Sequence, residues 1–386
     1  MDFKDKKVLL LGLGKEGMDN LLFFKGACKK LGVADEKENI ELDGVTVHLG
    51  KNYLQHLDEY DVIVKSPGIP MEKVKGRKVT SQSDIFLQKN RDRVIGITGT
   101  KGKSTISSIL NRCIKNSHLI GNVGYPVLSF MGKEGTFIYE LSSFQLATVT
   151  TSPHIAIILN IYPDYLDNHK TFEEYVEAKK NITRFQTKED ILIYNAEDKE
   201  VLKIIKDSKA KKIPFYPEEN KKNIATPLAP VYVLGKELGI DVEEGIKNFK
   251  PLPHRLEYVG KFNNADFYND SAATIPEATI KAIKTIKDVD TLIVGGVNKG
   301  IDYTKLIKEI EISNIKNLII LKGGENIKAN NVNIIPVKDM EEAVDVALKK
   351  TKSACILSPA ASSFNLFADY KERGELFKKY LNEKGT

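Results

Sequence analysis

The sequence has no tryptophan, only 3 cysteines and no long hydrophobic run in its 386 residues. Cys28, Cys113 and Cys355 are far apart and form no C-x-x-C pair, which argues against a disulfide framework, a zinc ribbon and a redox dithiol. The longest apolar runs, such as residues 155–159, fall well short of the roughly 20 residues of a membrane helix. We therefore expect the cysteines to be core residues, and we expect no membrane span.

An excess of charge of one sign is also missing. The 58 basic and 52 acidic residues leave a net charge of +6, which is too small and too scattered to indicate a nucleic-acid partner. Hydrophobic residues make up 41% and charged residues 28% of the chain, a balance that excludes disorder as its main state. The first residues run into a strand-like segment without a signal-peptide cleavage site. We expect a cytoplasmic protein that binds small anionic molecules.

Strand-like and helix-like segments alternate along the whole chain, which predicts an α/β fold with mostly parallel sheets. We expect helices at 17–31 and 106–115, and helix-starting capping pairs at Thr274 with Glu277 and at Asp339 with Glu342. Three series of strands indicate three domains, at 1–91, 92–251 and 252–386. The expected strands are 8–13, 33–35, 62–65 and 78–80; then 94–98, 137–140, 155–159 and 191–194; then 267–269, 291–294, 318–321 and 355–357.

A glycine-rich turn follows the first expected strand. Gly12, Gly14 and Gly17 have the spacing that lets a nucleotide diphosphate approach the N-terminus of the next helix. The turn does not distinguish NAD from other nucleotide diphosphates, so a nicotinamide oxidoreductase is one alternative and a plain tight turn is another. Asp35 comes sooner in the chain than the ribose-binding acid of a dinucleotide site.

A second glycine-rich turn gives a stronger signal. Residues 96–105, Gly-Ile-Thr-Gly-Thr-Lys-Gly-Lys-Ser-Thr, join a strand to a helix, as in a phosphate-binding P-loop. Lys103 would reach the β and γ phosphates of ATP, and the Ser104 hydroxyl would bind magnesium. Glu140 ends a strand beside this loop and is expected to hold the same ion. The expected ATP-binding residues are Gly99, Thr100, Lys101, Gly102, Lys103, Ser104 and Thr105.

Lys179 occupies an unusual position. Thr171 and Glu174 form a capping pair, and the helix that follows has an apolar stripe that includes Lys179, whereas Lys180 points away from it. Loss of water favours the neutral form of an amine, and a neutral amine can react with carbon dioxide to give a carbamate. A lysine that extends from the edge of the stripe into water is the alternative.

Together these motifs resemble the Mur ligase family. The general P-loop has its first glycine five residues before the position of Gly102, where this chain has Ile97. Here the glycine comes two residues later, at Gly99, and the Mur ligases share this shift. Residues 140–146, Glu-Leu-Ser-Ser-Phe-Gln-Leu, resemble the signature of the glutamate-adding members. Other matches lie on both sides of this segment. Before it comes Gly121-Asn-Val-Gly124, and after it, in order, come residues 159–161, Pro253-His-Arg255, Asn269-Asp-Ser271, Gly295-Gly296, residues 357–360 and Arg373-Gly374.

The resemblance implies an ATP-dependent amide ligase that adds glutamate to UDP-N-acetylmuramoyl-L-alanine through an acyl phosphate, in peptidoglycan precursor synthesis. It implies a Rossmann-like UDP-sugar-binding domain at 1–91, a central P-loop ATPase domain at 92–251 and a Rossmann-like glutamate-binding domain at 252–386. Only small molecules are implied as partners, with no nucleic acid and no membrane, and a monomer is expected.

The resemblance also implies roles for single residues. Lys103, Glu140 and Lys179 are the catalytic residues; Lys179 is carbamylated and helps to hold a second magnesium ion, so that Ser104, Glu140 and Lys179 are the metal-binding residues. Arg255 and Asp270 join the ATP-binding residues. The residues implied for substrate binding are Gly12, Gly14, Gly17, Ser66, Asn122, Thr274, Lys299, Ser363 and Tyr370.

Three positions depart from the family pattern. Tyr165 stands where a histidine usually binds the second magnesium, and a phenol that is protonated at neutral pH is a poor ligand for this ion. Asp164, Asp167, His169 or water would have to replace it. Thr226 stands where the family has an asparagine near the adenine, and Ala272 stands where it commonly has a lysine near the glutamate. These departures leave two alternatives open: a weakened or different-substrate nucleotide-binding relative, and another ligase of the superfamily. The sequence does not decide between D- and L-glutamate.

Overall fold

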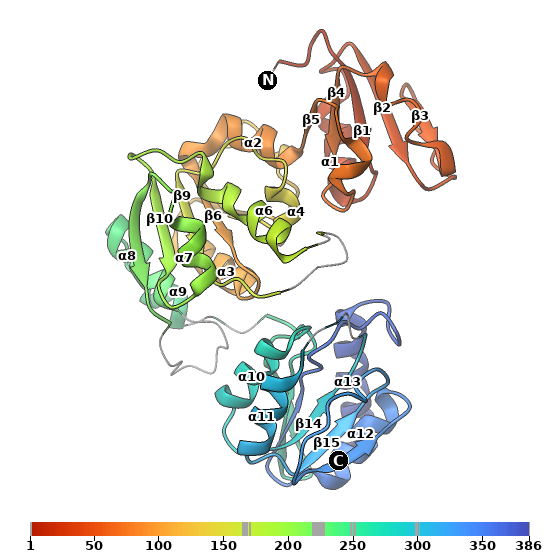
Figure 1. Ribbon diagram of the computed structural model, residues 1–386, viewed down its shortest axis with the longest axis vertical. Helices are drawn as coiled ribbons and strands as arrows, with labels where there is room; N and C mark the ends of the chain where they lie inside the picture. Colours follow the sequence, from red (N-terminus) through yellow and green to blue (C-terminus); the bar gives the residue numbers. More distant parts are fainter. Residues whose placement is uncertain are drawn as a thin grey trace. The chain divides into compact units, whose positions relative to one another are not determined.

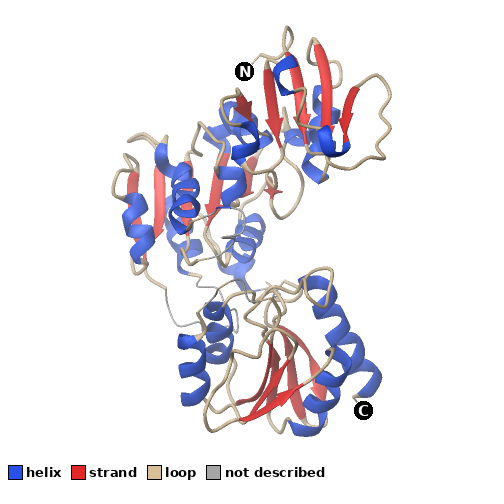
Figure 2. Cartoon of the chain, turned by 45° about the vertical axis from the view of Figure 1, so that its right-hand side comes forward, coloured by secondary structure: helices blue, strands red, loops and turns tan. Residues whose placement is uncertain are grey.

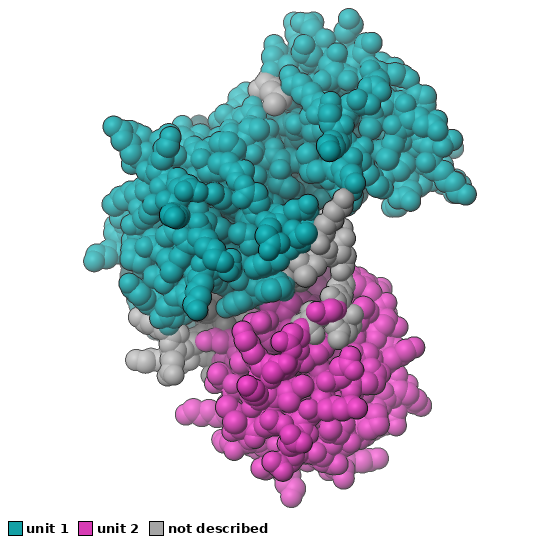
Figure 3. Space-filling model, in the orientation of Figure 1, with its two compact units in different colours: residues 1–218, 228–248 teal, residues 219–227, 249–386 magenta. Residues whose placement is uncertain are grey.

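The computed structural model describes residues 2–163, 169, 171–217, 228–247, 249, 252–297, 300 and 302–385. The chain forms two compact units, which we describe separately (Figure 3). The first unit comprises Met1–Glu218 and Leu228–Asn248, and the second comprises Glu219–Pro227 and Phe249–Thr386. None of the helices that the structure describes has both the length and the apolar character of a bilayer-crossing segment.

The first sheet of the first unit has the strand order β3-β2-β1-β4-β5, and all neighbouring strands are parallel (Figure 1). Its inner strands are short apolar runs with almost every side chain buried, as expected for parallel strands covered on both faces. The elements of this part are β1 Lys7–Leu11, α1 Lys15–Phe24, β2 Lys30–Asp35, β3 Thr46–Leu49, β4 Val62–Lys65, β5 Val79–Thr80 and α2 Gln82–Asn90.

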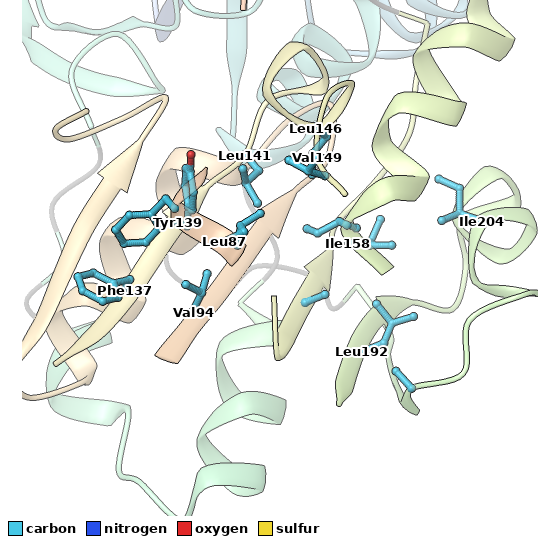
Figure 4. Close-up of a cluster of buried hydrophobic side chains, with 14 of the residues drawn as sticks. Leu87, Val94, Phe137, Tyr139, Leu141, Leu146, Val149, Ile158, Leu192 and Ile204 are labelled. Carbon is cyan, nitrogen blue, oxygen red and sulfur yellow. The ribbon is translucent and has the colours of Figure 1, made fainter. Parts of the chain in front are cut away.

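The second sheet of the first unit is also parallel throughout, with the order β11-β10-β9-β6-β8-β7. A hydrophobic cluster with Phe137, Tyr139, Ile158 and Leu192 fixes one face of this sheet (Figure 4). The strands are β6 Val94–Thr98, β7 Ser117–Gly121, β8 Thr136–Glu140, β9 Ile155–Ile158, β10 Ile191–Asn195 and β11 Lys211–Phe215. The helices are α3 Lys103–Cys113, α4 Ser143–Leu146, α6 Phe172–Arg184, α7 Lys199–Ile205, α8 Ala229–Leu238 and α9 Glu243–Lys247.

The second unit contains one sheet flanked by helices (Figure 2). Its strand order is β12-β13-β17-β14-β15-β16, and only β12 runs antiparallel to its neighbour. The strands are β12 Glu257–Phe262, β13 Ala265–Asn269, β14 Val289–Val294, β15 Asn317–Ile320, β16 Asn333–Pro336 and β17 Ala354–Leu357. The helices are α10 Pro276–Thr285, α11 Thr304–Ile312, α12 Met340–Lys350 and α13 Tyr370–Lys384.

The expected α/β class with mostly parallel sheets is confirmed. Every expected strand is present, with ends that differ by a few residues, but five strands were missed: β3, β7, β11, β12 and β16. All five lie at the edge of a sheet. Their side chains are largely exposed or half-buried, so they lack the continuous apolar run that marks an inner strand. The three-domain boundaries stay a prediction, because the first unit contains two sheets.

Three helix predictions need correction. The helix expected at 17–31 ends at Phe24, because the chain turns at Gly26 (φ 80°) and Lys30 already begins β2. The helix expected from residue 106 begins three residues earlier, at Lys103. Thr274 does not cap α10, which has Ile275 as its N-cap and Pro276 in its first turn. The predicted cap at Asp339 is confirmed, since its side chain accepts a hydrogen bond from the Glu342 N–H.

Candidate active site

The P-loop lies between β6 and α3, as predicted. Gly102 is the N-cap of α3 and has φ 88°, a left-handed conformation that favours glycine. Asn160, which follows β9, fixes the loop: its carbonyl oxygen accepts from Thr100 N at 2.8 Å, and its side chain bonds both backbone groups of Lys101 at 2.8 and 2.9 Å. The backbone amides at the start of α3 are thereby held in a form that suits a phosphate.

The Lys103 ammonium group spans this loop. Its Nζ donates to the carbonyl oxygens of Gly99 at 2.8 Å and Thr100 at 3.0 Å. Ser104 is buried in the first turn of the same helix, 4% exposed. A cation and a hydroxyl group are therefore positioned at the place where the loop would bind a polyphosphate.

Glu140 ends β8, which pairs with β6 so that Glu140 lies opposite Ile97. Its side chain is fully buried. Oε1 accepts a hydrogen bond from Asn122 Nδ2 at 2.8 Å, whereas Oε2 has no hydrogen-bond partner among the described residues. A buried carboxylate oxygen without a donor is costly unless a cation meets it.

These groups fit a magnesium ion. Magnesium prefers oxygen ligands and usually takes one or two from the protein and the rest from phosphate and water. Within the described ranges, His, Cys, Asp and Glu side chains do not gather in a group of three that could form a complete metal site. The Glu140 carboxylate and the Ser104 hydroxyl therefore suit an ion that is bound together with a nucleotide.

Lys179 lies on the buried face of α6, as predicted, and is 1% exposed. Its Nζ donates to the Gly99 carbonyl oxygen at 2.9 Å and to Thr98 Oγ1 at 3.3 Å, and it lies 4.8 Å from the centre of the Tyr175 ring. Lys180 points away and pairs with Asp207 at 2.7 Å. The structure thus brings the nitrogen of Lys179 to the same loop that Lys103 spans.

His169 is packed between α4 and α6. Its ring stacks on Phe144 with centroids 4.8 Å apart, and its Nε2 lies 2.9 Å from Ser143 Oγ. Burial, reinforced by the positive charges of Lys179 and Lys65, lowers the pKa of His169 to about 4. The imidazole is therefore neutral at pH 7. The other candidate replacements for the usual histidine, Asp164 and Asp167, and Tyr165 itself lie outside the described residues.

The first glycine turn closes tightly onto α1. A side chain at Gly17 would meet the Gly12 carbonyl oxygen at 2.2 Å, so glycine is required there. Ser66 Oγ donates to the same oxygen at 2.9 Å. Asp35 accepts a hydrogen bond from Leu13 N at 2.6 Å, so its carboxylate stabilises the glycine turn. The predicted substrate residues Gly12, Gly17 and Ser66 are therefore adjacent, and Gly14 is the N-cap of α1.

The remaining predicted residues belong to the second unit. Asp270 is buried, and its oxygens accept from Leu256 N at 3.1 Å and Ser358 Oγ at 2.8 Å. Arg255 and Thr274 are half-buried. Lys299 and Thr226 lie outside the described residues.

The sequence motifs gave Arg373 no role, but this residue of α13 organises the loop that carries Ser363 and the loops that follow β13 and β14. Its guanidinium group is fully buried and donates to Ser271 Oγ, and to the carbonyl oxygens of Ser271, Gly295 and Ala361, at 2.8 to 3.4 Å. Ser271 Oγ in turn donates to the Tyr370 carbonyl oxygen at 2.8 Å. The Arg373-Gly374 pair was a visible motif, but only the fold shows which loops the arginine joins.

A cavity of about 630 Å³ opens in the first unit. It lies between the loop after β4 and helices α4 and α6. Of the predicted site residues that the structure describes, only His169, a candidate replacement for the usual histidine, lines it, and the cavity reaches Lys65 and Ala178, the neighbours of Ser66 and Lys179. Its lining includes Ile69, Phe144, His169, Asn181 and Arg184.

Comparison with known proteins assigns this architecture to a family. Residues 97–265 match the Mur ligase middle domain. The UDP-N-acetylmuramoylalanine--D-glutamate ligase of Clostridioides difficile is 31% identical, with 99% of each chain covered. The enzyme of the same name from Clostridium botulinum (strain 657 / Type Ba4) is 32% identical, with 98% of each chain covered. The fold is similar to that of a MurF ligase of Thermotoga maritima solved with ADP, with a TM-score of 0.62, 14% identity and coverage of 100% of this chain and 97% of that one. The chain therefore belongs to the Mur ligase family, and within it to the UDP-N-acetylmuramoylalanine--D-glutamate ligases.

Proposed function

We propose that this chain joins D-glutamate to UDP-N-acetylmuramoyl-L-alanine with hydrolysis of ATP to ADP, through an acyl phosphate. The chain is an ATP-dependent ligase of peptidoglycan precursor synthesis, as its relatives over the full length indicate. One observation supports the detailed proposal most: the P-loop with Lys103 lies beside a buried carboxylate, Glu140, that has one oxygen without a donor.

In the proposed first step, the alanyl carboxylate attacks the γ-phosphorus of ATP, and ADP leaves with the bond electrons. Lys103 exchanges the Gly99 and Thr100 carbonyl oxygens for phosphate oxygens, and the loop amides bind the same groups. Glu140 and Ser104 would hold magnesium, which would supply positive charge against the phosphates. In the second step, the amine of glutamate attacks the acyl carbon, loses a proton and displaces phosphate.

The substrate residues follow from this scheme. We assign the diphosphate of the UDP-sugar to the turn of Gly12, Gly14 and Gly17 with Ser66, and the muramoyl-alanine part to the cavity beside α6. We assign Asn122 to the surroundings of the reacting groups, which its hydrogen bond to Glu140 supports. In the second unit we assign Arg255 and Asp270 to ATP, and Thr274, Lys299, Ser363 and Tyr370 to glutamate.

We further propose that Lys179 reacts with carbon dioxide to form a carbamate that helps to hold a second magnesium ion. Its burial, at 1% exposure, supports this, because loss of water favours the neutral amine that reacts with carbon dioxide. The test is carbon-13 NMR of protein in labelled bicarbonate: we expect a carbamate signal that is lost in Lys179→Ala and kept in Lys180→Ala, the exposed neighbour. Wild-type protein without that signal would refute the modification.

The reaction is tested by ADP release in the presence of magnesium, ATP and UDP-N-acetylmuramoyl-L-alanine. We expect release that requires D-glutamate, with L-glutamate and no amino acid as comparisons, and that disappears in Lys103→Ala. Folded protein that binds the UDP-sugar but releases no ADP with either enantiomer would support the weakened or different-substrate alternative.

We propose a monomer that acts in the cytoplasm. Light scattering would check the oligomeric state, and cell fractionation would check the location.

A further inference from the structure

Glu16 lies within the glycine turn to which the diphosphate is assigned. It is the second residue of α1, whose N-cap, Gly14, forms no side-chain cap bond. Glu16 is half-buried, and its Oε1 accepts a hydrogen bond from Gln145 Nε2 at 2.7 Å. Its backbone oxygen accepts from Gln82 Nε2 at 3.1 Å. The carboxyl group is therefore held near the helix N-terminus and is not free to turn into solvent.

The charged groups around Glu16 are occupied elsewhere. Lys65, 3% exposed, donates to the carbonyl oxygens of Ser66, Pro67 and Ile69. On α1 itself, Lys15 donates to the Gly124 carbonyl oxygen and Asp19 accepts from Leu128 N. On β8, the Tyr139 hydroxyl donates to Ser83. Glu16 forms no ion pair in the described part of the chain.

This setting disfavours a negative charge on Glu16. Burial raises the pKa of its carboxyl group to about 7; the Gln145 hydrogen bond and the charges of Lys65 and Lys15 oppose this rise, and the charge of Asp19 adds to it. A diphosphate bound at the first turn of α1 would bring further negative charge close to Glu16, and like charges disfavour ionisation. Binding of the anion and ionisation of Glu16 therefore compete.

We propose that Glu16 takes up a proton from solvent when the UDP-sugar binds, so that a neutral carboxyl group faces the diphosphate and makes binding of this anion pH-dependent. The inference rests on the proposed diphosphate site at Gly12 to Gly17. The proton goes to the Glu16 carboxylate, and no bond of the substrate changes.

The direction of the pH effect follows from this exchange. Below about pH 7 most free protein already carries the proton, so affinity for the UDP-sugar is constant. Above this pH the proton has to be acquired on binding, and affinity falls by up to about tenfold per pH unit. A glutamine at position 16 is neutral at every pH, so the fall is expected to disappear in Glu16→Gln.

Calorimetric titration with UDP-N-acetylmuramoyl-L-alanine, without ATP, tests the proposal in two buffers of different ionisation enthalpy. A diphosphate esterified at both ends and an alanyl carboxylate do not titrate near pH 7, so proton uptake reports on the protein. We expect uptake of about half a proton at pH 7 in the wild type and clearly less in Glu16→Gln, in which Lys65, whose pKa burial lowers to about 8, remains as a neighbour that can take up a proton. At pH 8 we expect Glu16→Gln to bind about tenfold more tightly than the wild type, a gain that misfolding would not produce.

Asp19→Asn is the matched control. Asp19 is a buried carboxylate on the same helix, but it accepts from Leu128 N rather than facing the turn. Because the charge of Asp19 raises the pKa of Glu16, this variant should still take up a proton on binding, with the pH range of the uptake shifted slightly downward. Binding by the wild type without proton uptake, or equal uptake in Glu16→Gln, would overturn the inference about Glu16. No binding by the folded wild type would instead refute the nucleotide site itself, and the inference with it.

Discussion

At the scale of single residues, the core of the first unit contains a carboxylate that its own hydrogen bonds do not satisfy. Glu140 is fully buried and receives one donor, from Asn122, on one of its two oxygens. Removing one partner of a buried polar pair costs about 1–3 kcal/mol, and more when the group is charged. A ligand that supplies positive charge would offset this cost, so Glu140 stabilises the apo protein less than it can stabilise a complex.

Glu140→Gln separates these two effects. Gln keeps an oxygen for the Asn122 bond but removes the charge, so we expect the thermal midpoint to be unchanged or higher than in the wild type. We expect kcat for ADP release to fall by about 100-fold or more and the magnesium concentration for half-maximal rate to rise. Wild-type magnesium dependence in the variant would show that Glu140 is not a ligand.

At the scale of elements, the carboxyl ends of β13, β14 and β17 are joined by one buried side chain. Arg373 of α13 donates to residues that follow each of these strands: Ser271, Gly295 and Ala361. Burial lowers the pKa of its guanidinium group to about 9, partly offset by the charge of Asp270, so Arg373 remains charged at pH 7. Arg373 therefore fixes the loops that follow these three strands against the first turn of α13, where Tyr370 lies.

Arg373→Met should destabilise the second unit by about 3 kcal/mol or more, because several buried carbonyl oxygens lose a charged donor. Arg373→Lys should lose less stability than Arg373→Met, since lysine keeps the positive charge but not the forked geometry of the guanidinium group. Lys378→Met is the control on the same helix; its partly exposed pairs with Glu257 and Glu375 should be worth only about 1 kcal/mol. Urea unfolding measures all three, and equal losses for Arg373→Met and Lys378→Met would contradict the role given to Arg373.

The amino ends of β9 and β10 are joined in a similar way by Asp190. Its oxygens lie 2.6 Å from Arg91 Nη2 and 2.8 Å from His154 Nδ1. Burial alone would raise the pKa of this carboxyl group, but the donors from Thr187, His154 and Arg91 outweigh burial and hold the pKa below its ordinary value.

A lowered pKa means that the folded state binds this proton less readily than the unfolded state does. The stability that Asp190 contributes is therefore present above the unfolded pKa of about 4 and is lost as pH falls below it. Asp190→Asn should lower the thermal midpoint at pH 7 and show a smaller further loss between pH 5 and pH 3 than the wild type. An acid profile parallel to that of the wild type would contradict this prediction.

At the scale of the whole molecule, no covalent cross-link holds the chain, because all three cysteines are free. Cys355 is buried, as the sequence predicted, whereas Cys28 and Cys113 are only half-buried. Burial raises the pKa of all three thiols, which keeps them protonated and slow to react.

We therefore expect the thermal midpoint to be the same with and without a reducing agent. A thiol reagent should modify Cys28 and Cys113 slowly in the native protein and Cys355 only after unfolding. Full modification in guanidinium should give three thiols per chain. Rapid native reaction of Cys355, or a midpoint that falls on reduction, would contradict the structure.

The sequence predicted inner strands better than edges. Apolar runs such as those of β6 and β9 are buried on both faces, and burial on both faces is what makes a run continuous. Edge strands such as β3 and β16 have mixed side chains and exist because a neighbouring strand supplies hydrogen bonds. Likewise, Thr274 had the spacing of a cap but Pro276 fixed the helix start instead.

By itself, the sequence determined the α/β class, both glycine turns and the inward position of Lys179, because the alternation of strands and helices, tight turns and helix faces depend on neighbours a few residues apart. Only the tertiary structure decided that Asn160 fixes the P-loop, that one oxygen of Glu140 lacks a donor, that Arg373 joins three strand ends and that Gln145 holds Glu16. These contacts join residues tens of positions or more apart, and their partners are set by the strand order of each sheet, which no local pattern contains.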